Sequence, residues 1–343
     1  MRAPRGIPRT IAAIHLRRGL ALAALVLAAF SAPVVAAAQA DPMQAPATSQ
    51  AGAAGAADYD AASAGGAPAS PYHVDTTLDW GRRVLRVRVS LDMVSAGLAL
   101  PEGRLEAERM IDRDLSGLVK DRIFSLQVDS HRTVRDTIMD GSLDAEKLIA
   151  LDGDARRLES SFSRDMRSLI ATYEFSLDAV GALYVLHSEA LPAPTALGWS
   201  PARAHTGIVI VANGKLPVHG ERVSDRLRPC LFPRVFDSGM RLLLGKDRVE
   251  PAVLRAQGEV GYAAEVPSGE RAGDDPLLIM AAEIFGTDRT DLVISRDDAN
   301  AILELRENRD LLRQGKVTIV LDRSELVARS PGAARESTLP PIP

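Results

Sequence analysis

Histidines are the first side chains to consider for chemistry in this chain, because they serve as acids, bases and metal ligands near neutral pH. Five of them follow residue 40, and no two have a metal-binding spacing such as His-Glu-x-x-His. They are His73, His131, His187, His205 and His219. His131 lies close in sequence to Asp129 and Asp136, the residue types of an acid–base pair. Because such a pair also needs convergent geometry, a surface or hydrogen-bonded histidine is favoured over a catalytic one.

Closely spaced carboxylates and one serine are the other candidates. Asp152-Gly153-Asp154 is a candidate calcium loop, but an EF-hand needs several more oxygen ligands, so a turn is favoured. Asp274 and Asp275 are adjacent, whereas a hydrolase needs two carboxylates that face each other across a substrate, so a solvated loop is favoured. Ser238 precedes Gly239 without the Gly-x-Ser-x-Gly pattern of serine hydrolases. We therefore predict no catalytic, cofactor-binding or metal-binding residue, and a protein that is not an enzyme.

Cys230 is the only cysteine, so the chain has no internal disulfide and no lipid acceptor near its N-terminus. Its neighbours Pro229, Leu231 and Phe232 are apolar. A buried thiol that behaves as a small hydrophobe is favoured over a reactive thiol or an intermolecular disulfide. The stability of the fold must then come from packing.

The first 40 residues have the order of a secretory signal peptide: a basic start, the apolar run Leu20 to Phe30, and small residues. We predict cleavage at the small-x-small sites that end in Ala38 and Ala40. An uncleaved anchor is the alternative, because the 19 residues from 20 to 38 approach the length of a spanning helix. Arg17-Arg18 suggests the twin-arginine route, but the residues around this pair favour the general route.

Asp41, rather than a cysteine, follows the predicted cleavage site. We therefore predict a periplasmic protein that is not lipidated and has no transmembrane segment in its mature chain. The leader contains five arginines and no acid, so the mature chain has 36 basic and 45 acidic residues, and 36 minus 45 gives a formal net charge of −9. Nucleic acid is excluded as a partner, because proteins bind its phosphates through Lys and Arg.

Composition divides the rest of the chain into two folded domains. We predict a disordered linker rich in Ala, Gly and Pro over 41–77 and a first domain over 78–190. A Pro-rich linker over 191–204, a second domain over 205–323 and a disordered tail over 324–343 follow. With about 250 structured residues, the chain is long enough to bury two cores.

The first domain shows clear periodic patterns. Apolar and polar residues alternate over 84–93, which predicts a strand with one buried face and a basic stripe (Arg82, Arg86, Arg88) on the other. After Pro101 a helical apolar stripe predicts a long amphipathic helix; its residues are Ile111, Leu115, Leu118, Val119, Ile123 and Leu126. Short helices are expected around 134–138 and 143–149, then a hairpin of 156–162 with 168–177.

The second domain is predicted to be mostly β. Its expected strands are 207–212, 231–236, 240–244, 277–285, 291–294 and 317–321. Asp237-Ser238-Gly239 marks a hairpin turn, and Ser295 with Asp298 resembles a capping box that opens a helix. The predicted fold class is α+β: two small domains, each an antiparallel or mixed sheet with helices packed on one face.

From residue 205 onward the chain resembles bacterial envelope proteins of unassigned function. The resemblance rests on Thr206 to Ile210, Arg228-Pro229, Pro233 to Asp237, Gly261-Tyr262 and Asp291 to Ser295. By its order of strand, helix and hairpin, the first domain resembles the small outer-membrane lipoprotein family and the N-terminal domain of flagellar assembly protein T. The chain departs from these families in its missing lipid-acceptor cysteine and in a polar insertion over 215–227.

This resemblance implies a non-enzymatic periplasmic protein with a structural or assembly role, and envelope or flagellar basal-body proteins as its partners. It implies no catalytic residues. Two alternatives remain open: a binding protein that holds a small ligand or glycan in a cleft between its domains, and a hydrolase with an unrecognised carboxylate or serine site.

Overall fold

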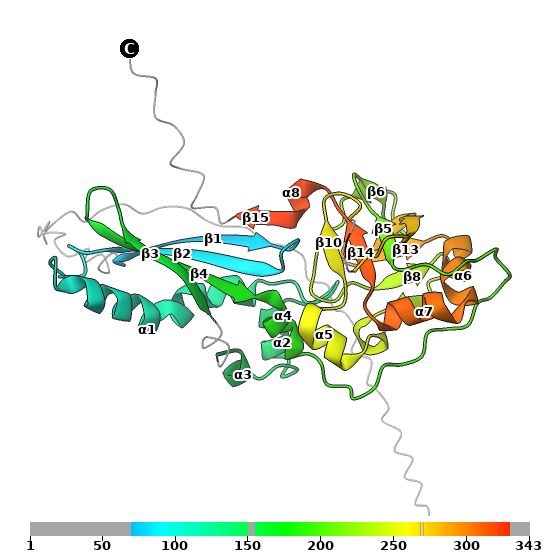
Figure 1. The fold of residues 1–343 in the computed structure, drawn as a ribbon, viewed down its shortest axis with the longest axis horizontal. Helices are drawn as coiled ribbons and strands as arrows, with labels where there is room; N and C mark the ends of the chain where they lie inside the picture. The colour runs from blue at the N-terminus through cyan, green and yellow to red at the C-terminus, as the bar shows by residue number, and fades with distance from the viewer. Residues whose placement is uncertain (1–69, 150–154, 268, 270, 330–343) are drawn as a thin grey trace, which may run out of the picture. The chain divides into compact units, whose positions relative to one another are not determined.

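The alternating residues around Val87 form β2 (Val84–Asp92), the central strand of a five-stranded antiparallel sheet (Figure 1). The strand order is β15 (Val327–Arg329), β1 (Tyr72–Asp79), β2, β4 (Ser168–Ser176) and β3 (Arg156–Phe162). Leu85, Val87, Val89 and Leu91 of β2 are fully buried. They face one side of the sheet because successive side chains of a strand point to opposite faces.

Helix α1 (Gly103–Phe124) covers one face of this sheet. Its buried side chains follow the predicted stripe and include Ile111, Leu115, Val119 and Ile123. The hydroxyl of Tyr173 on β4 donates to Asp112 Oδ1 of α1 at 2.6 Å, which fixes the helix on the sheet. Pro101 precedes the helix, as predicted. The short helices α2 (Val134–Met139), α3 (Ala145–Ile149) and α4 (Leu177–Ala182) complete this first domain.

Both ends of the first domain differ from the prediction. Folded structure begins at Tyr72 with β1, so the predicted start at residue 78 was too late. β1 contains mostly polar residues, so it lacks the clear alternation of apolar and polar residues that made β2 recognisable. At the other end, α8 (Arg323–Leu326) and β15 occupy residues assigned to a disordered tail. Ala328 of β15 lies opposite Leu78 of β1, so the chain returns to its first sheet after completing the second domain.

The second domain contains two four-stranded sheets. The first is entirely parallel, in the order β10 (Gly261–Ala263), β14 (Val317–Val320), β5 (Ile208–Val211) and β11 (Leu277–Met280). The second is mixed, in the order β12 (Glu283–Phe285), β13 (Asp291–Ile294), β8 (Val235–Asp237) and β9 (Leu242–Leu244). All four residues of β14 are buried, as expected for a parallel strand covered on both faces. Strands β6 (Leu216–Pro217) and β7 (Ser224–Asp225) form a small hairpin in the insertion.

The single strand predicted over 277–285 is wrong, because the chain changes sheets in its middle. Ala281 N donates to Val211 O beside the parallel sheet, and Ala282 N donates to Val293 O of the mixed sheet. The predicted turn after Asp237 is correct: Asp237 Oδ1 accepts from Gly239 N at 2.9 Å, and β8 and β9 pair on either side. The strand predicted over 231–236 begins later than expected, because β8 starts at Val235.

One helix of the second domain, α6 (Arg296–Glu304), begins where a side chain caps the backbone. Ser295 Oγ accepts from Asp298 N at 3.0 Å, which confirms the predicted start of α6. Leu305 has an extended backbone and separates α6 from α7 (Arg306–Arg313). The remaining helices are the 3-10 helix η2 (Lys246–Arg248) and α5 (Pro251–Gln257), which was not predicted and has Pro251 in its first turn.

The computed structural model describes residues 70–149, 155–267, 269 and 271–329, all of which lie in one unit of the chain. The leader with its predicted cleavage residues Ala38 and Ala40, most of the predicted 41–77 linker, Asp152 to Asp154 and the chain beyond 329 lie outside the described residues. The structure confirms the predicted α+β class with two domains. In the described ranges, no helix has both the length and the apolar character that crossing a membrane requires.

Candidate ligand pocket

Segments of both domains line a pocket of about 530 Å³. The lining comes from three stretches of chain: 128–142, 184–191 and 232–248. Two backbone hydrogen bonds hold the first and third stretches together, from Leu231 N to Gln127 O at 3.0 Å and from Phe232 N to Val128 O at 2.9 Å. The two domains also contribute to one continuous apolar core. The pocket is therefore a fixed feature of this packing.

Aromatic and aliphatic side chains form much of the pocket surface. The Tyr184 and Phe232 rings lie 5.8 Å apart, centroid to centroid, at 66° in a T-shaped contact. The Tyr184 hydroxyl lies 2.8 Å from Thr137 Oγ1, and burial raises the pKa of this tyrosine. Leu186 and Leu191 stand at the rim with 81% and 56% of their surface exposed. This surface suits an apolar ligand group.

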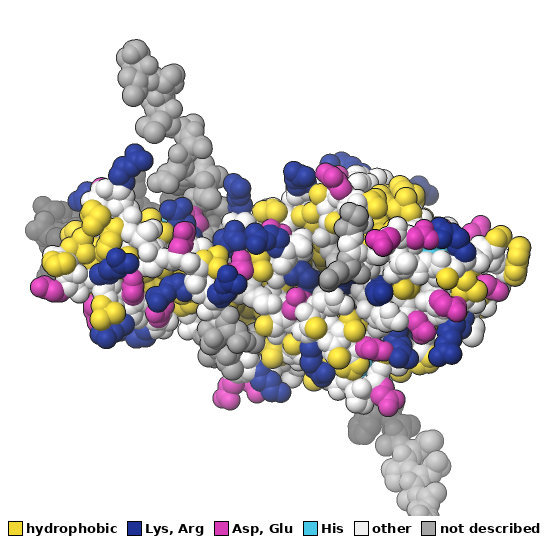
Figure 2. All heavy atoms as spheres, viewed as in Figure 1, with side chains coloured by type: hydrophobic (Ala, Val, Ile, Leu, Met, Phe, Trp, Pro, Cys, Tyr) yellow, Lys and Arg dark blue, Asp and Glu magenta, His cyan; other side chains and the backbone are white. Residues whose placement is uncertain are grey.

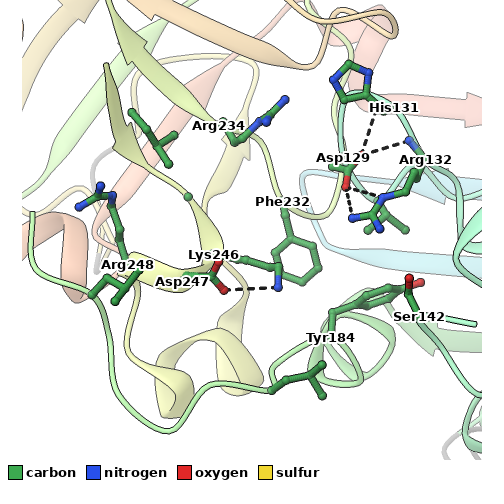
Figure 3. A pocket seen from close by; sticks show the side chains of 15 residues that line it. Asp129, His131, Arg132, Ser142, Tyr184, Phe232, Arg234, Lys246, Asp247 and Arg248 are labelled. Atoms are coloured by element: carbon green, nitrogen blue, oxygen red, sulfur yellow. Dashed lines mark hydrogen bonds and ion pairs between the residues drawn. The ribbon is translucent and has the colours of Figure 1, made fainter. Parts of the chain in front are cut away.

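Arg132 is one of the basic side chains in the pocket wall. Its Nη2 and Nε lie 2.7 and 3.1 Å from Asp129 Oδ2, and its Nη1 lies 3.7 Å from Asp140 Oδ2. Asp129 raises the pKa of Arg132. In Figure 3, Asp129 with Arg132 and Lys246 with Asp247 form two groups; the ring of Phe232 lies between them, and the ring of Tyr184 lies below Arg132 in this view.

Arg234 is anchored from behind by a fully buried carboxylate. Asp291 accepts from Arg234 through Nε at 3.0 Å, Nη2 at 2.6 Å and the backbone N at 2.9 Å. Nη2 also donates to Ser130 Oγ at 2.6 Å. Among the described residues no hydrogen bond involves its Nη1. The guanidinium is thus held in one orientation with a donor left over.

Lys246 and Arg248 bring two more cations to the pocket from η2. Lys246 Nζ lies 3.4 Å from Asp247 Oδ1. Arg248 Nη1 donates to the backbone oxygen of Pro192, and its buried Nε has no hydrogen-bond partner. Burial lowers the pKa of Arg248, and no carboxylate of the described chain forms an ion pair with it. A ligand anion would find an uncompensated positive charge here.

The structure separates His131 from the acids that suggested an acid–base pair. His131 donates its backbone N to Asp129 Oδ1 at 3.0 Å, while its ring Nδ1 lies 3.3 Å from Thr287 Oγ1. Asp129 binds Arg132, and Asp136 forms a capping box with Thr133 at the start of α2. No carboxylate is within hydrogen-bonding distance of the imidazole in the described chain. His131 nevertheless lines the pocket, together with Asp129.

The other candidates from the sequence lie outside this pocket. Asp275 binds Arg203 through two hydrogen bonds, one of them at 2.8 Å from Nη2, and this contact lowers the pKa of Asp275. Asp274 is exposed beside it. Ser238 is exposed in its hairpin turn, and Cys230 is a free thiol that is fully buried, with a pKa raised by burial.

One histidine contact was missed by sequence reasoning. His219 Nδ1 lies 2.5 Å from Glu283 Oε2, and the ring packs against Phe285 at a centroid distance of 5.9 Å. His219 and His131 line the same small pocket although 88 positions separate them. No local pattern could have signalled this proximity. Across the described ranges, no group of three or more His, Cys, Asp or Glu side chains is arranged to hold a metal ion.

Comparison with known proteins gives two matches, both to domains of one protein. Residues 71–183 match the family model described as the N-terminal domain of Treponema pallidum Tp0624. Residues 207–323 match the model described as the second domain of the same protein. Neither description names an activity, a ligand or a partner. The search of curated proteins found no match. In two successive segments, this chain is therefore similar to the first two domains of Tp0624, in the same order.

Proposed function

We propose that this protein is a non-enzymatic periplasmic binding protein, and that its pocket holds a small ligand with an apolar body and an anionic group. The observation that carries this proposal is the wall of the pocket: rigidly held cations beside a Tyr184–Phe232 aromatic surface. Arg234 and Arg132 are each fixed by a carboxylate, so neither has to be ordered when a ligand binds.

Charge and chemistry support this proposal over the hydrolase alternative. The cations of the wall outnumber its acids, and those acids are already engaged: Asp129 with Arg132 and Asp247 with Lys246. A general base needs a carboxylate or imidazole that is available to the substrate, and the one imidazole of this wall, His131, contacts Thr287 Oγ1 and has no carboxylate of the described chain to orient it. The periplasmic location rests on the order of basic, apolar and small residues at the start of the sequence.

A fluorescent probe tests the proposal directly. Anilinonaphthalene sulfonate has an apolar ring system and one anionic group, and its emission rises when it leaves water. We expect saturable binding to the folded protein, weakened at least fivefold by Lys246→Gln and by Leu186→Glu, which puts a negative charge at the rim. Leu186→Gln and Lys215→Gln are the matched controls. Equal affinity in all five proteins would contradict the proposal.

The second candidate is a structural or assembly role with envelope or flagellar basal-body partners. It is favoured by Leu197 and Trp199 in the segment between the domains, which are 67% and 80% exposed. Exposed aromatic side chains often anchor protein interfaces. Crosslinking in intact envelopes followed by purification tests this role. We expect a specific partner whose yield falls with Trp199→Ser, and recovery of the protein alone would contradict it.

A further inference from the structure

Three arginines lie on one face of α7. Arg306, Arg309 and Arg313 are spaced by three and four residues, which places them on the same side of a helix. Asn308, Leu311 and Leu312 are buried on the opposite side. In Figure 2, Lys and Arg side chains gather over the part of the surface where Figure 1 shows α7, with acidic side chains beside them. The buried face of α7 packs against the rest of the domain, and its basic face remains accessible.

The basic face lines a second pocket, of about 390 Å³, whose opposite wall is the segment 192–195. This segment is tied to the second domain at both ends. Leu191 N donates to Asp247 O at 2.7 Å, and Arg241 Nη1 donates to Thr195 O at 2.6 Å. Arg248 also lines this pocket, through a side chain that donates to Pro192 O. The pocket thus has four arginines and one acid, Asp310.

Only two of the four arginines are balanced by carboxylates. Arg313 binds Glu250 Oε1 through Nη2 at 2.7 Å and Nε at 2.9 Å, and Arg306 Nε lies 3.7 Å from Asp310 Oδ2. Arg309 donates only to backbone oxygens, those of Leu303 at 2.6 Å and Glu304 at 3.5 Å.

Among the described residues, Arg248 likewise donates only to a backbone oxygen, that of Pro192, and its buried Nε has no partner. No carboxylate of the described chain forms an ion pair with either guanidinium. The pocket therefore contains two guanidinium groups whose charge no carboxylate of the described chain neutralises.

We propose that this pocket binds a phosphate monoester group, held by Arg248 and Arg309 with Arg313 at the edge. A phosphate monoester carries a charge of about −1.5 to −2 at neutral pH, which matches two uncompensated guanidiniums. Its three oxygens can accept several N–H donors at once, and arginine forks fit this geometry. A single carboxylate would leave one of the two charges unbalanced.

Calorimetric titration of the purified protein with glycerol 3-phosphate, a phosphate monoester without an apolar body, tests the proposal. We expect one site per chain, affinity at least tenfold higher than for acetate, and a loss of at least tenfold in Arg309→Gln and in Arg313→Gln. Neither residue lines the pocket of Tyr184 and Phe232, so this result is independent of the function proposed above. Arg109→Gln, an exposed surface change on α1, is the control and should bind like the wild type.

A vesicle assay distinguishes a soluble ligand from a lipid headgroup. Sedimentation with phosphatidylcholine vesicles that contain phosphatidic acid, lost in Arg309→Gln, supports a lipid phosphate. Binding of glycerol 3-phosphate without sedimentation supports a soluble one. No binding in either assay, or binding that both variants retain, overturns the proposal. Thermal unfolding of each variant shows whether it is folded. If the Arg309→Gln variant does not fold, binding by the Arg313→Gln variant alone decides between the outcomes.

Discussion

Arg234 Nη2 lies 2.6 Å from Oδ2 of Asp291, a carboxylate with no exposed surface. Asp291 accepts from three nitrogens of Arg234, and the same guanidinium donates to Ser130 in the first domain. This contact therefore does two things. It sets the orientation of a cation in the pocket wall, and it links the mixed sheet of the second domain to the loop that carries Asp129.

Asp291→Asn should lower the free energy of unfolding by about 2–3 kcal/mol, because hydrogen bonds to charged groups contribute about 1.5–3 kcal/mol and several are weakened together. The loss is smaller than for a fully buried pair, since about a third of the Arg234 side chain, 34%, is exposed. Urea unfolding measures it. Glu106→Gln, which removes an exposed partner of Arg109, should change stability by less than about 0.5 kcal/mol. Equal effects of the two changes would contradict this account.

Gly258 is required beside Arg83, a buried arginine that sequence reasoning did not identify. Arg83 Nε donates to Asp178 Oδ1 at 2.5 Å and Nη1 donates to Val260 O at 3.2 Å. A Cβ at Gly258 would lie 2.5 Å from Arg83 Cζ, and the φ of 69° with a ψ of −179° is a backbone conformation essentially restricted to glycine. Gly258→Ala should therefore cost clearly more than strain alone, which is about 1–3 kcal/mol.

Gly141→Ala is the matched control for this substitution. Gly141 has a φ of 75°, and a Cβ there would meet no atom within 4 Å. Its substitution measures the strain of a positive φ without a clash. Thermal unfolding of both variants should place Gly258→Ala well below Gly141→Ala in stability. Similar losses in the two would show that Arg83 moves aside without cost.

Glu259 predicts a pH dependence of stability. Its side chain is fully buried, and neither carboxyl oxygen has a hydrogen-bond partner. Burial, followed by the nearby Asp291, raises the pKa of Glu259 well above the ordinary value of 4.5. The folded protein then keeps this proton over a pH range in which the unfolded chain has lost it. The contribution to stability is complete below pH 4.5 and falls as the pH rises from there towards the folded pKa.

Glu259→Gln removes this dependence, because an amide does not ionise. Wild type and variant should differ little in pH dependence below pH 4.5. Above pH 4.5, the free energy of unfolding of the variant should increase relative to that of the wild type by up to about 1.4 kcal/mol per pH unit, until the folded pKa is reached. Urea unfolding at a series of pH values measures the difference. A constant difference across the series would mean that Glu259 is ionised in the folded protein.

The parts of the fold that could be predicted are those with long, one-sided patterns. β2, β4 and α1 each bury one face, so period and burial coincide in the sequence. β1 and β15 could not be predicted, because β1 is polar and the three residues of β15 are all exposed. The change of sheet after Ala281 depends on which backbone oxygens are in reach, and no residue type signals it.

The sequence could predict where a pocket would lie, in a cleft between the domains, but not which residues would line it. Arg234 and Asp291 are 57 positions apart, and Asp129 and Asp247 come from different domains. Their proximity results from the packing of two sheets and several loops. By contrast, the spacing of Arg306, Arg309 and Arg313 is a local signal, and it could have been read as one basic helix face.

Hydrogen exchange with and without anilinonaphthalene sulfonate tests the central claim most directly, because it locates the bound probe on the chain. We predict slower exchange in three segments, 128–132, 184–191 and 232–248, which line the pocket. The apolar groove along α1, lined by Ile123, Phe124 and Leu148, is the competing site. Protection confined to 116–124 and 145–148, with no change around Tyr184 and Phe232, would contradict the claim that the pocket is a binding site.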